Sequence, residues 1–511
     1  MSRWSLVLTA IFALAAALRL WGTNFGLPYT YHPDEGALVM PALNILRTGD
    51  YRPLRLDYGS AYIYTLTALY IPYFLYGAWC GYFTTVADLP VYVDYHQIAQ
   101  YPVPALFLIG RVVTAVLGGL TVLVVYSLGN RLAGRWAGAV AAVLLAVEPL
   151  HARHAHFVTT DVPLTFLLML ALGRILDVFE RGNWHDYFWA GAWVGLSAST
   201  KFPGGVMFSA LLIAHLLRSH TWSEVLDKRL VIGIAATAGG FLVGTPYALD
   251  LPYFLNWMAV NLSFYGKTAS ALVEGPTWLY YAKNLFLGET GPIVLVGVLG
   301  LARFVRQEWR RGVVVTAFPA IYATSIVLQT SRYSRHLIPL IPFLVLGAGM
   351  FLVTAAEWLA RRLPTTVTPP RLPFVLAGLV ALIAIVPLGV TIKTSALLAG
   401  QDIRTLALEW YNANIPPQAK VAADWTGPSF TTGRHNVWRT WDLAEHNADW
   451  YVEQQFAYLV ISEPRVFDPN RTAQLEASYR EIMSRFTLVK VFEGALLGID
   501  GRHIWIYSVT R

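Results

Sequence analysis

The chain is poor in cysteine and in charge. Its single cysteine, Cys80, excludes an intramolecular disulfide framework. Only 14% of its residues are charged, whereas an ordinary soluble domain has about 25%. No internal repeat or nucleic-acid motif is visible, and the net charge of +7 comes from short basic clusters between apolar runs. The lack of repeated halves argues against a secondary transporter, which stays open as an alternative.

Apolar residues are abundant instead. They make up 56% of the 511 residues, and the mean hydropathy of +0.48 is too high for a soluble domain. A spanning helix needs about 20 predominantly apolar residues. We therefore predict a mainly α-helical, polytopic membrane protein with about eleven transmembrane helices. The apolar runs lie at residues 4–21, 104–129, 136–149, 162–179, 187–200, 204–217, 230–248, 291–305, 313–329, 336–357 and 373–393.

Lys and Arg cluster in alternate loops, which the positive-inside rule places in the cytoplasm. This alternation requires that the tyrosine-rich stretch 61–79 does not cross the membrane. We therefore assign it to an external loop of juxtamembrane helices, residues 23–103. The expected location is the cytoplasmic membrane, with the C-terminal part outside the cytoplasm. The five basic loops carry Arg131/Arg135, Arg181, Arg218/Lys228/Arg229, Arg303/Arg306/Arg310/Arg311 and Arg361/Arg362/Arg371.

The chain changes character after the last apolar run. We predict a transmembrane domain over residues 1–394 and a small extracytoplasmic α/β domain over residues 395–511. In the second domain, periodicity predicts helices and short strands in mixed order. The helices are expected at 402–414 and 472–486, and the strands at 420–424, 456–462, 487–492 and 503–509.

The predicted topology brings polar motifs to the outer face. The first is Tyr31-His32-Pro33-Asp34-Glu35-Gly36, which follows the first apolar run. Ionisable residues at a membrane boundary suggest a functional site. A helix is expected from Pro33 to Leu46, stopped by Gly49-Asp50. The other outer motifs are His151-Ala-Arg-His-Ala-His-Phe-Val-Thr-Thr-Asp161, Ser199-Thr-Lys201 and Ser331-Arg-Tyr-Ser-Arg-His336.

The order of these motifs resembles the GT-C glycosyltransferases. It is most similar to glycosyltransferase family 39, the branch related to protein O-mannosyltransferases and lipid A aminoarabinose transferases. The resemblance covers roughly residues 1–395. It implies a polyprenyl- or dolichyl-phosphate sugar donor and transfer at the outer membrane face, typically with inversion. The presumed catalytic base of the family lies in the first loop, which corresponds here to Asp34.

Three carboxylates are candidates for catalysis. Attack by a hydroxyl acceptor needs a base, and we assign this role to Asp34, with a helix cap as the alternative. Glu35 would orient the acceptor or hold a metal, unless it is a solvated neighbour. Asp161 is either catalytic or the N-cap of the helix that continues through Val162-Pro163.

Several basic residues are candidates for the donor phosphate. Guanidinium and ammonium groups suit a phosphodiester near a low-dielectric boundary. Lys201, Arg332 and Arg335 are assigned to it, with snorkelling to lipid headgroups as the alternative. Arg111 lies inside the second apolar run, so it must face protein or water. We expect it to pair with an acid near the site or to contribute to phosphate binding.

A divalent cation (Mg, Mn or Zn) is a further hypothesis. Imidazole and carboxylate groups are suitable ligands, and the candidate set is Glu35, His151, His154 and His156. The spacing is not that of a closed zinc site, so satisfied interfacial histidines are the competing interpretation.

The sequence thus predicts an enzyme. It would transfer a sugar from a lipid-phosphate donor to a hydroxyl of a lipid, glycan or protein acceptor. A non-catalytic lipid-binding or assembly protein of the cell envelope stays open beside the transporter. The presence of Asp34 and Asp161 argues mildly against it.

Overall fold

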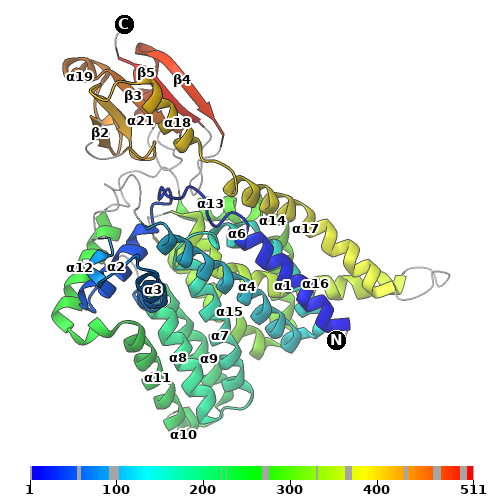
Figure 1. The fold of residues 1–511 in the computed structure, drawn as a ribbon. Coiled ribbons are helices and arrows are strands. Elements are labelled where there is room, and N and C mark those ends of the chain that lie inside the picture. The colour runs from blue at the N-terminus through cyan, green and yellow to red at the C-terminus, as the bar shows by residue number, and fades with distance from the viewer. Residues whose placement is uncertain are drawn as a thin grey trace.

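The structure is a computed structural model. It describes residues 3–53, 59–90, 103–219, 221–225, 227–267, 276–329, 332–362, 371–430, 436–463, 473–494 and 503–509. A large helical part leads through α17 (Arg371–Leu398) into a small domain that contains a sheet (Figure 1). The mainly α-helical membrane fold with a C-terminal α/β domain is confirmed. Helix α17 ends past the domain boundary predicted at residue 394.

All eleven predicted apolar runs fall on helices of the first part. The α-helices are α1 (Arg3–Leu20), α2 (Gly36–Thr48), α3 (Ala61–Trp79), α4 (Ala105–Ala133), α5 (Arg135–Val147), α6 (Pro149–His154), α7 (Asp161–Glu180), α8 (Trp184–Thr200), α9 (Phe208–Arg218), α10 (Trp222–Val225), α11 (Lys228–Gly244), α12 (Leu251–Lys267), α13 (Thr277–Ala282), α14 (Gly291–Gln307), α15 (Trp309–Val327), α16 (Ile341–Arg362) and α17. Short 3₁₀ and π elements join them: η1 (Val86–Asp88), η3 (Phe202–Met207), η4 (Pro246–Leu249), η5 (Lys283–Leu287) and η6 (Ser334–Leu340).

Length and composition identify part of this set as membrane spans. Within the described ranges, four helical segments are long and apolar enough to cross a bilayer, and a fifth is added if a pair bent by 101° counts as one broken span. Other predicted spans, such as α1 and α5, are apolar but shorter. The chain is a multi-pass membrane protein, and eleven crossings stay a prediction. The four segments are Ala105–Ala133, Asp161–Glu180, Ser334–Arg362 and Leu372–Asn414.

Small residues let these helices approach closely. A Cβ placed on Gly191 of α8 would lie 2.2 Å from the carbonyl oxygen of Gly233 in α11, and one on Gly195 would lie 2.1 Å from that of Thr237. Close backbone contact through glycine is a common way to pack helices in membranes, where dispersion replaces the hydrophobic driving force. The packing between α8 and α11 therefore depends on glycine at these two positions.

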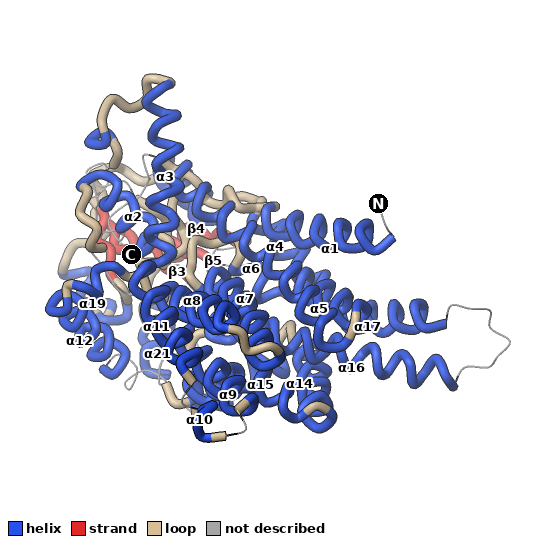
Figure 2. Tube along the Cα trace, turned by 90° about the horizontal axis from the view of Figure 1, so that it is seen from below, coloured by secondary structure: helices blue, strands red, loops and turns tan. Residues whose placement is uncertain are grey.

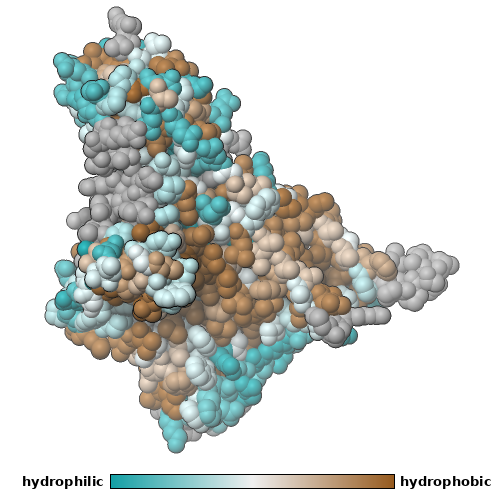
Figure 3. Space-filling view, in the orientation of Figure 1, coloured by the Kyte–Doolittle hydropathy of each residue, from teal (hydrophilic) through white to brown (hydrophobic). Residues whose placement is uncertain are grey.

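Helix α3 lies across the bundle. It is seen end-on in Figure 1 and lengthwise in Figure 2, whereas α4 and α7 run along the bundle. Its far end is open, with Leu75 59% and Trp79 85% exposed. Hydrophobic residues cover the middle of the helical part, and hydrophilic ones gather on the C-terminal domain and at the opposite end (Figure 3). These features agree with a juxtamembrane helix rather than a crossing one.

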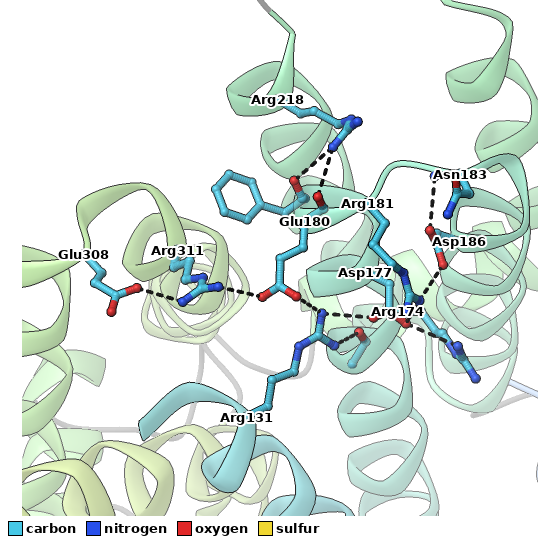
Figure 4. Close-up of polar contacts among 12 residues, drawn as sticks. Arg131, Arg174, Asp177, Glu180, Arg181, Asn183, Asp186, Arg218, Glu308 and Arg311 are labelled. Carbon is cyan, nitrogen blue, oxygen red and sulfur yellow. Dashed lines mark hydrogen bonds and ion pairs between the residues drawn. The ribbon is translucent and has the colours of Figure 1, made fainter. Parts of the chain in front are cut away.

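Four of the five basic loops meet at the end of the bundle opposite the C-terminal domain (Figure 4). Arg131 contacts Asp177 at 2.9 Å and Glu180 at 2.6 Å, and Arg311 contacts Glu180 at 3.2 Å. The remaining contacts in this network are Arg174–Asp177, Arg181–Asp177, Arg181–Asp186, Arg311–Glu308 and those of Arg218 with two carbonyl oxygens. The loops predicted to share one side of the membrane thus lie together in space.

The C-terminal domain contains a five-stranded sheet in the order β2-β1-β3-β5-β4. Strands β1, β2 and β3 are parallel, and β5 is antiparallel to both β3 and β4. The four predicted strands are present, and β2 was not predicted. The elements are α18 (Ile403–Asn414), β1 (Val421–Asp424), β2 (Val437–Thr440), η7 (Leu443–Glu445), α19 (Ala448–Glu453), β3 (Tyr458–Ser462), α21 (Ala473–Arg485), β4 (Thr487–Glu493) and β5 (His503–Ser508).

Candidate active site

Asp34 lies in the turn before α2, which begins at Gly36 and not at Pro33 as expected. Its backbone N–H donates to His32 Nδ1 at 3.2 Å. Its carboxylate forms an ion pair with Arg335 of η6, although the two residues are 301 positions apart. The side chains are 20% and 19% exposed, so the pair is partly accessible from outside the protein. The candidate base and one candidate phosphate ligand are therefore in direct contact.

A second ion pair joins Asp161 and Lys201. Asp161 is the first residue of α7, Lys201 follows the end of α8, and Nζ lies 2.6 Å from the Asp161 carboxylate. The N-cap of α7 is Thr160 and not Asp161. With 3% and 12% of their side chains exposed, Asp161 and Lys201 are more enclosed than Asp34 and Arg335.

Histidines and Phe157 fill the space around the two ion pairs. The His32 ring stacks on Phe157 at 4.3 Å, and His154 meets the same ring edge-on at 5.7 Å. Burial lowers the pKa of His32 well below its ordinary value, and the positive charge of Arg335 acts in the same direction. Burial also lowers the pKa of His154, and the positive charge of Lys201 acts in the same direction. Both imidazoles are thus neutral near pH 7.

His154 is unusual because both ring nitrogens are buried without a hydrogen-bond partner among the described residues. Buried polar atoms are normally paired, and exceptions concentrate at functional sites. Nearby, His336 Nδ1 contacts the hydroxyl of Tyr281 at 2.8 Å. Sequence reasoning did not single out His32, His336 or Tyr281 as site residues. The sequence contains one indication, which is that His32 and His336 lie within the polar motifs 31–36 and 331–336. It contains none for Tyr281.

Glu35 is not the solvated neighbour of Asp34 that one interpretation expected. Its side chain is wholly buried and bound by Arg111, from Nε at 2.8 Å and from Nη2 at 2.7 Å. Its Oε1 also accepts the Val158 N–H at 3.0 Å. Nη1 of Arg111 donates to the carbonyl oxygens of Thr23 and Phe25. Arg111 pairs with an acid, as one of its two interpretations predicted. Neither side chain reaches the surface, so the pair holds the loop and α4 together, and the acceptor role of Glu35 and the phosphate role of Arg111 stay predictions.

The metal set of Glu35, His151, His154 and His156 is not assembled. The described residues contain no group of three or more His, Cys, Asp or Glu side chains that would hold a metal ion. His151 Nδ1 faces the guanidinium of Arg19 at 3.1 Å, and the His156 ring lies between the carbonyl oxygens of Ala152 and Trp21. A guanidinium at a ring nitrogen is incompatible with a cation there, so these residues do not fit Mg, Mn or Zn.

Arg332 lies three residues before Arg335 but has a different environment. Its Nε donates to Thr277 Oγ1 at 3.3 Å, at the start of α13. The structure therefore separates the two arginines that the sequence grouped as phosphate ligands. Arg335 contacts the candidate base, and Arg332 lies towards α13.

An apolar groove of about 430 Å³ adjoins the Asp161–Lys201 pair. Thr200 and Pro163, which flank this pair in the sequence, line it. The walls come from α3, α4, α7, α8 and α11 and are mostly aliphatic or aromatic. The other lining residues are Ala61, Tyr62, Tyr64, Thr65, Leu117, Phe166, Leu167, Leu196, Val243 and Gly244.

The C-terminal domain contacts the Asp34 motif through Tyr31. The Tyr31 hydroxyl is 2.8 Å from Thr405 Oγ1, and Arg404 Nη1 donates to the Tyr31 carbonyl at 3.2 Å. Arg404 is itself paired with Asp402 at 2.6 Å, and both side chains are buried. The domain beyond the membrane part therefore helps to form the loop that carries the candidate base.

Comparisons with known proteins agree with this architecture. Residues 107–247 match the family described as dolichyl-phosphate-mannose-protein mannosyltransferase. The fold is similar to ArnT from Cupriavidus metallidurans, with 16% identity, 99% of this chain and 98% of that chain covered, and a TM-score of 0.52. It is also similar to the oligosaccharyltransferase AglB from Archaeoglobus fulgidus, with 14% identity, coverage of 100% and 74%, and a TM-score of 0.54. No curated protein matches the chain.

These matches define the class of the protein. It is a polytopic membrane protein with the fold of the GT-C glycosyltransferases, and the resemblance inferred from the order of its motifs is confirmed. A second ArnT structure, bound to undecaprenyl phosphate, matches with 14% identity and a TM-score of 0.50 over 99% of this chain and 98% of that one.

Proposed function

We propose that this protein transfers a sugar from a polyprenyl-phosphate or dolichyl-phosphate donor to a hydroxyl acceptor at the outer face of the cytoplasmic membrane. The acceptor oxygen attacks the anomeric carbon and forms the new glycosidic bond. The bond from that carbon to the phosphate oxygen breaks, and the lipid phosphate leaves. Asp34 takes the acceptor proton as general base.

The observation that carries this proposal is the contact between Asp34 and Arg335, with Lys201 and Arg335 both close enough to His336 for their charges to act on it. A glycosyl transfer from a phosphodiester needs a base beside cations that hold the departing charge. In the absence of donor, Asp34 and Asp161 act as counterions for Arg335 and Lys201. A donor phosphate would compete for both cations and release Asp34 to accept the proton.

The apolar groove supports a lipid donor. Thr200, which precedes Lys201, is one of its lining residues, so a prenyl chain lying in the groove would have its phosphate within reach of that cation. ArnT has been obtained with undecaprenyl phosphate and AglB with dolichol-phosphate. A donor of this class fits the apolar walls and the cations beside them.

The test is transfer by the purified protein in lipid nanodiscs from a panel of radiolabelled polyprenyl-phosphate sugars. One donor is expected to release its sugar, and Asp34→Asn to abolish release while still binding the donor. Asp88→Asn, an exposed acid on the same external loop, is the matched control. If the protein binds none of these donors, the proposal fails. Binding without any Asp34-dependent release would favour a non-catalytic lipid-binding protein.

A further inference from the structure

The parallel strands of the C-terminal domain end towards the candidate active site. Helix α18 starts beside Tyr31 and runs away from the helical part (Figure 1). Arg439, in the second half of β2, lies near both Tyr31 and Arg404 at the start of α18. Because β2 and β3 are parallel to β1, their carboxyl ends lie at the same edge. In open α/β sheets, ligands bind outside the carboxyl ends of the strands.

Arg439 of β2 lies near this edge and forms no ion pair with an acid of the described part of the chain. It pairs in register with Ala423, whose side chain belongs to the apolar core under α18, so Arg439 points to the α18 face. Its Nη2 donates to the Trp425 carbonyl at 2.7 Å. Its Nε is buried and has no hydrogen-bond partner among the described residues. Burial and the neighbouring Arg404 lower the pKa of Arg439 to about 10, where it is still a cation at pH 7.

Asp402, the acid beside the neighbouring Arg404, is already engaged in an ion pair with Arg404. A buried charge without a counterion is costly and is normally paired in the functional state. Arg439 as a whole is only partly buried, so an anion can still reach it. The unused donor at this edge therefore points to an anionic ligand.

Two tryptophans form a platform beside Arg439. Trp425 and Trp441 stack with ring centroids 5.7 Å apart, and the Arg439 guanidinium lies 5.0 Å from the Trp425 ring centroid. Trp441 is 54% exposed. An exposed indole offers a flat apolar face for the C–H face of a pyranose and a polar N–H at its edge. A cation beside such a platform suits a sugar ring that carries a negative charge.

We propose that Arg439, Trp425 and Trp441 form an acceptor subsite for a saccharide bearing a phosphate or carboxylate group. The guanidinium binds the anion, and the two indoles hold the ring. The subsite lies beside Tyr31, three positions before Asp34, so a glycan held there has a short path to the candidate base. This inference rests on the proposed function, because it treats the bound saccharide as the acceptor.

The test uses saturation-transfer NMR of the full-length protein in nanodiscs with mannose 6-phosphate, glucuronate and uncharged mannose as probes. A charged probe is expected to bind at least fivefold better than mannose. Arg439→Gln should abolish that preference. Arg480→Gln should retain it, because Arg480 is 69% exposed on α21 and pairs with Glu476. Equal binding of all three probes to wild type, or an unchanged preference in Arg439→Gln, would overturn the subsite.

Trp441→Ala provides an independent variant, because the exposed indole can be removed without opening the core. It should weaken binding of the charged sugar and leave binding of inorganic phosphate unchanged. A second experiment, with a polyprenyl-phosphate donor added, distinguishes failure of the subsite from failure of the proposed function. Asp34-dependent sugar release with no Arg439-dependent binding overturns the subsite alone. Arg439-dependent binding without donor binding overturns the enzyme function and the acceptor role together.

Discussion

Tyr31 and Arg404 join the loop of the candidate base to the C-terminal domain. The guanidinium carbon of Arg404 lies 3.9 Å from the centre of the Tyr31 ring, in addition to its hydrogen bond to the Tyr31 carbonyl. These two contacts between Tyr31 and Arg404 form a clamp. Tyr31 precedes Asp34 by three positions, so any shift of the clamp moves the carboxylate. The C-terminal domain is therefore a structural element of the candidate site and not a separate appendage.

The clamp predicts that Arg404 affects turnover more than donor binding. Arg404→Leu would remove the guanidinium that pairs with the buried Asp402 carboxylate, so it is combined with Asp402→Asn. We expect the double variant to lower kcat and to leave donor Kd unchanged, because Arg335 and Lys201 are untouched. Asp402→Asn alone is the control. Equal changes in kcat and donor Kd would show that the clamp only maintains the overall fold.

Asp34 and Glu35 are adjacent, but mutation of Asp34 should lower the transfer rate, whereas mutation of Glu35 should lower the stability of the protein. Asp34→Asn is expected to stay folded and to lose at least about 100-fold in transfer rate, as expected for removal of a general base. Glu35→Gln leaves the Arg111 guanidinium buried and uncompensated, which costs about 3–5 kcal/mol of stability. Transfer rates and thermal unfolding should be measured on both. Near-full activity of Asp34→Asn would make Asp161 the next candidate base.

Arg335 and Arg332 should contribute unequally to donor binding. Loss of a hydrogen bond to a charged group costs about 1.5–3 kcal/mol, roughly a 10- to 100-fold increase in Kd. We expect this increase for Arg335→Leu and a smaller one for Arg332→Leu, because Arg332 lies towards Thr277. Binding of a polyprenyl phosphate can be titrated for each variant. A larger effect at Arg332 would mean that the donor phosphate lies towards α13.

The buried neutral histidines predict a loss of stability on acidification. The pKa values of His32 and His154 are lowered in the folded protein, so below about pH 6.5 the unfolded chain binds protons that the folded state does not. Each histidine should therefore remove about 1.4 kcal/mol of stability per pH unit below that value. His154→Asn should reduce the dependence of Tm on pH, and His185→Asn, an exposed site, should not. If Tm depended on pH equally in the wild type and in His154→Asn, His154 would not be a buried neutral histidine.

The topology predicts that the end of α3 and the C-terminal domain face the same side of the membrane. Cys80 is the only cysteine and is exposed, so it reports on α3 without mutation. Ala413→Cys in a Cys80→Ser background reports on α18, where position 413 is exposed. Both should react with an impermeant thiol reagent in intact cells. Labelling of either one only after lysis would reverse the side assigned to that segment.

The apolar runs predicted the helices well, because a run of about 20 apolar residues has few other stable states in a membrane. The strand β2 was not predicted. Its four residues, Val437–Thr440, are too short for a clear alternation. It is stabilised by pairing with β1, a contact that depends on the tertiary fold.

The candidate site was predicted only in outline. The sequence placed Asp34, Asp161, Lys201 and Arg335 on one face, because loop charge and helix parity fix the side of each loop. It did not indicate which carboxylate of the Asp34-Glu35 dipeptide points inwards, since adjacent residues in a turn diverge and their partners come from distant loops. The contact of Asp34 with Arg335 spans 301 positions and has no local signature.

Helix α7 connects the candidate site to the opposite end of the bundle. Its 20 residues begin at Asp161, and its last turn carries Asp177 and Glu180 in the network with Arg131. At 1.5 Å per residue, it is about 30 Å long, close to the thickness of the hydrocarbon layer. If the arginine network lies in one headgroup layer of the membrane, the length of α7 places Asp161 and its partner Lys201 at the depth of the opposite headgroup layer. A lipid phosphate would then bind Lys201 while it stays at the depth of the lipid headgroups, so binding would not require the donor to move out of the bilayer.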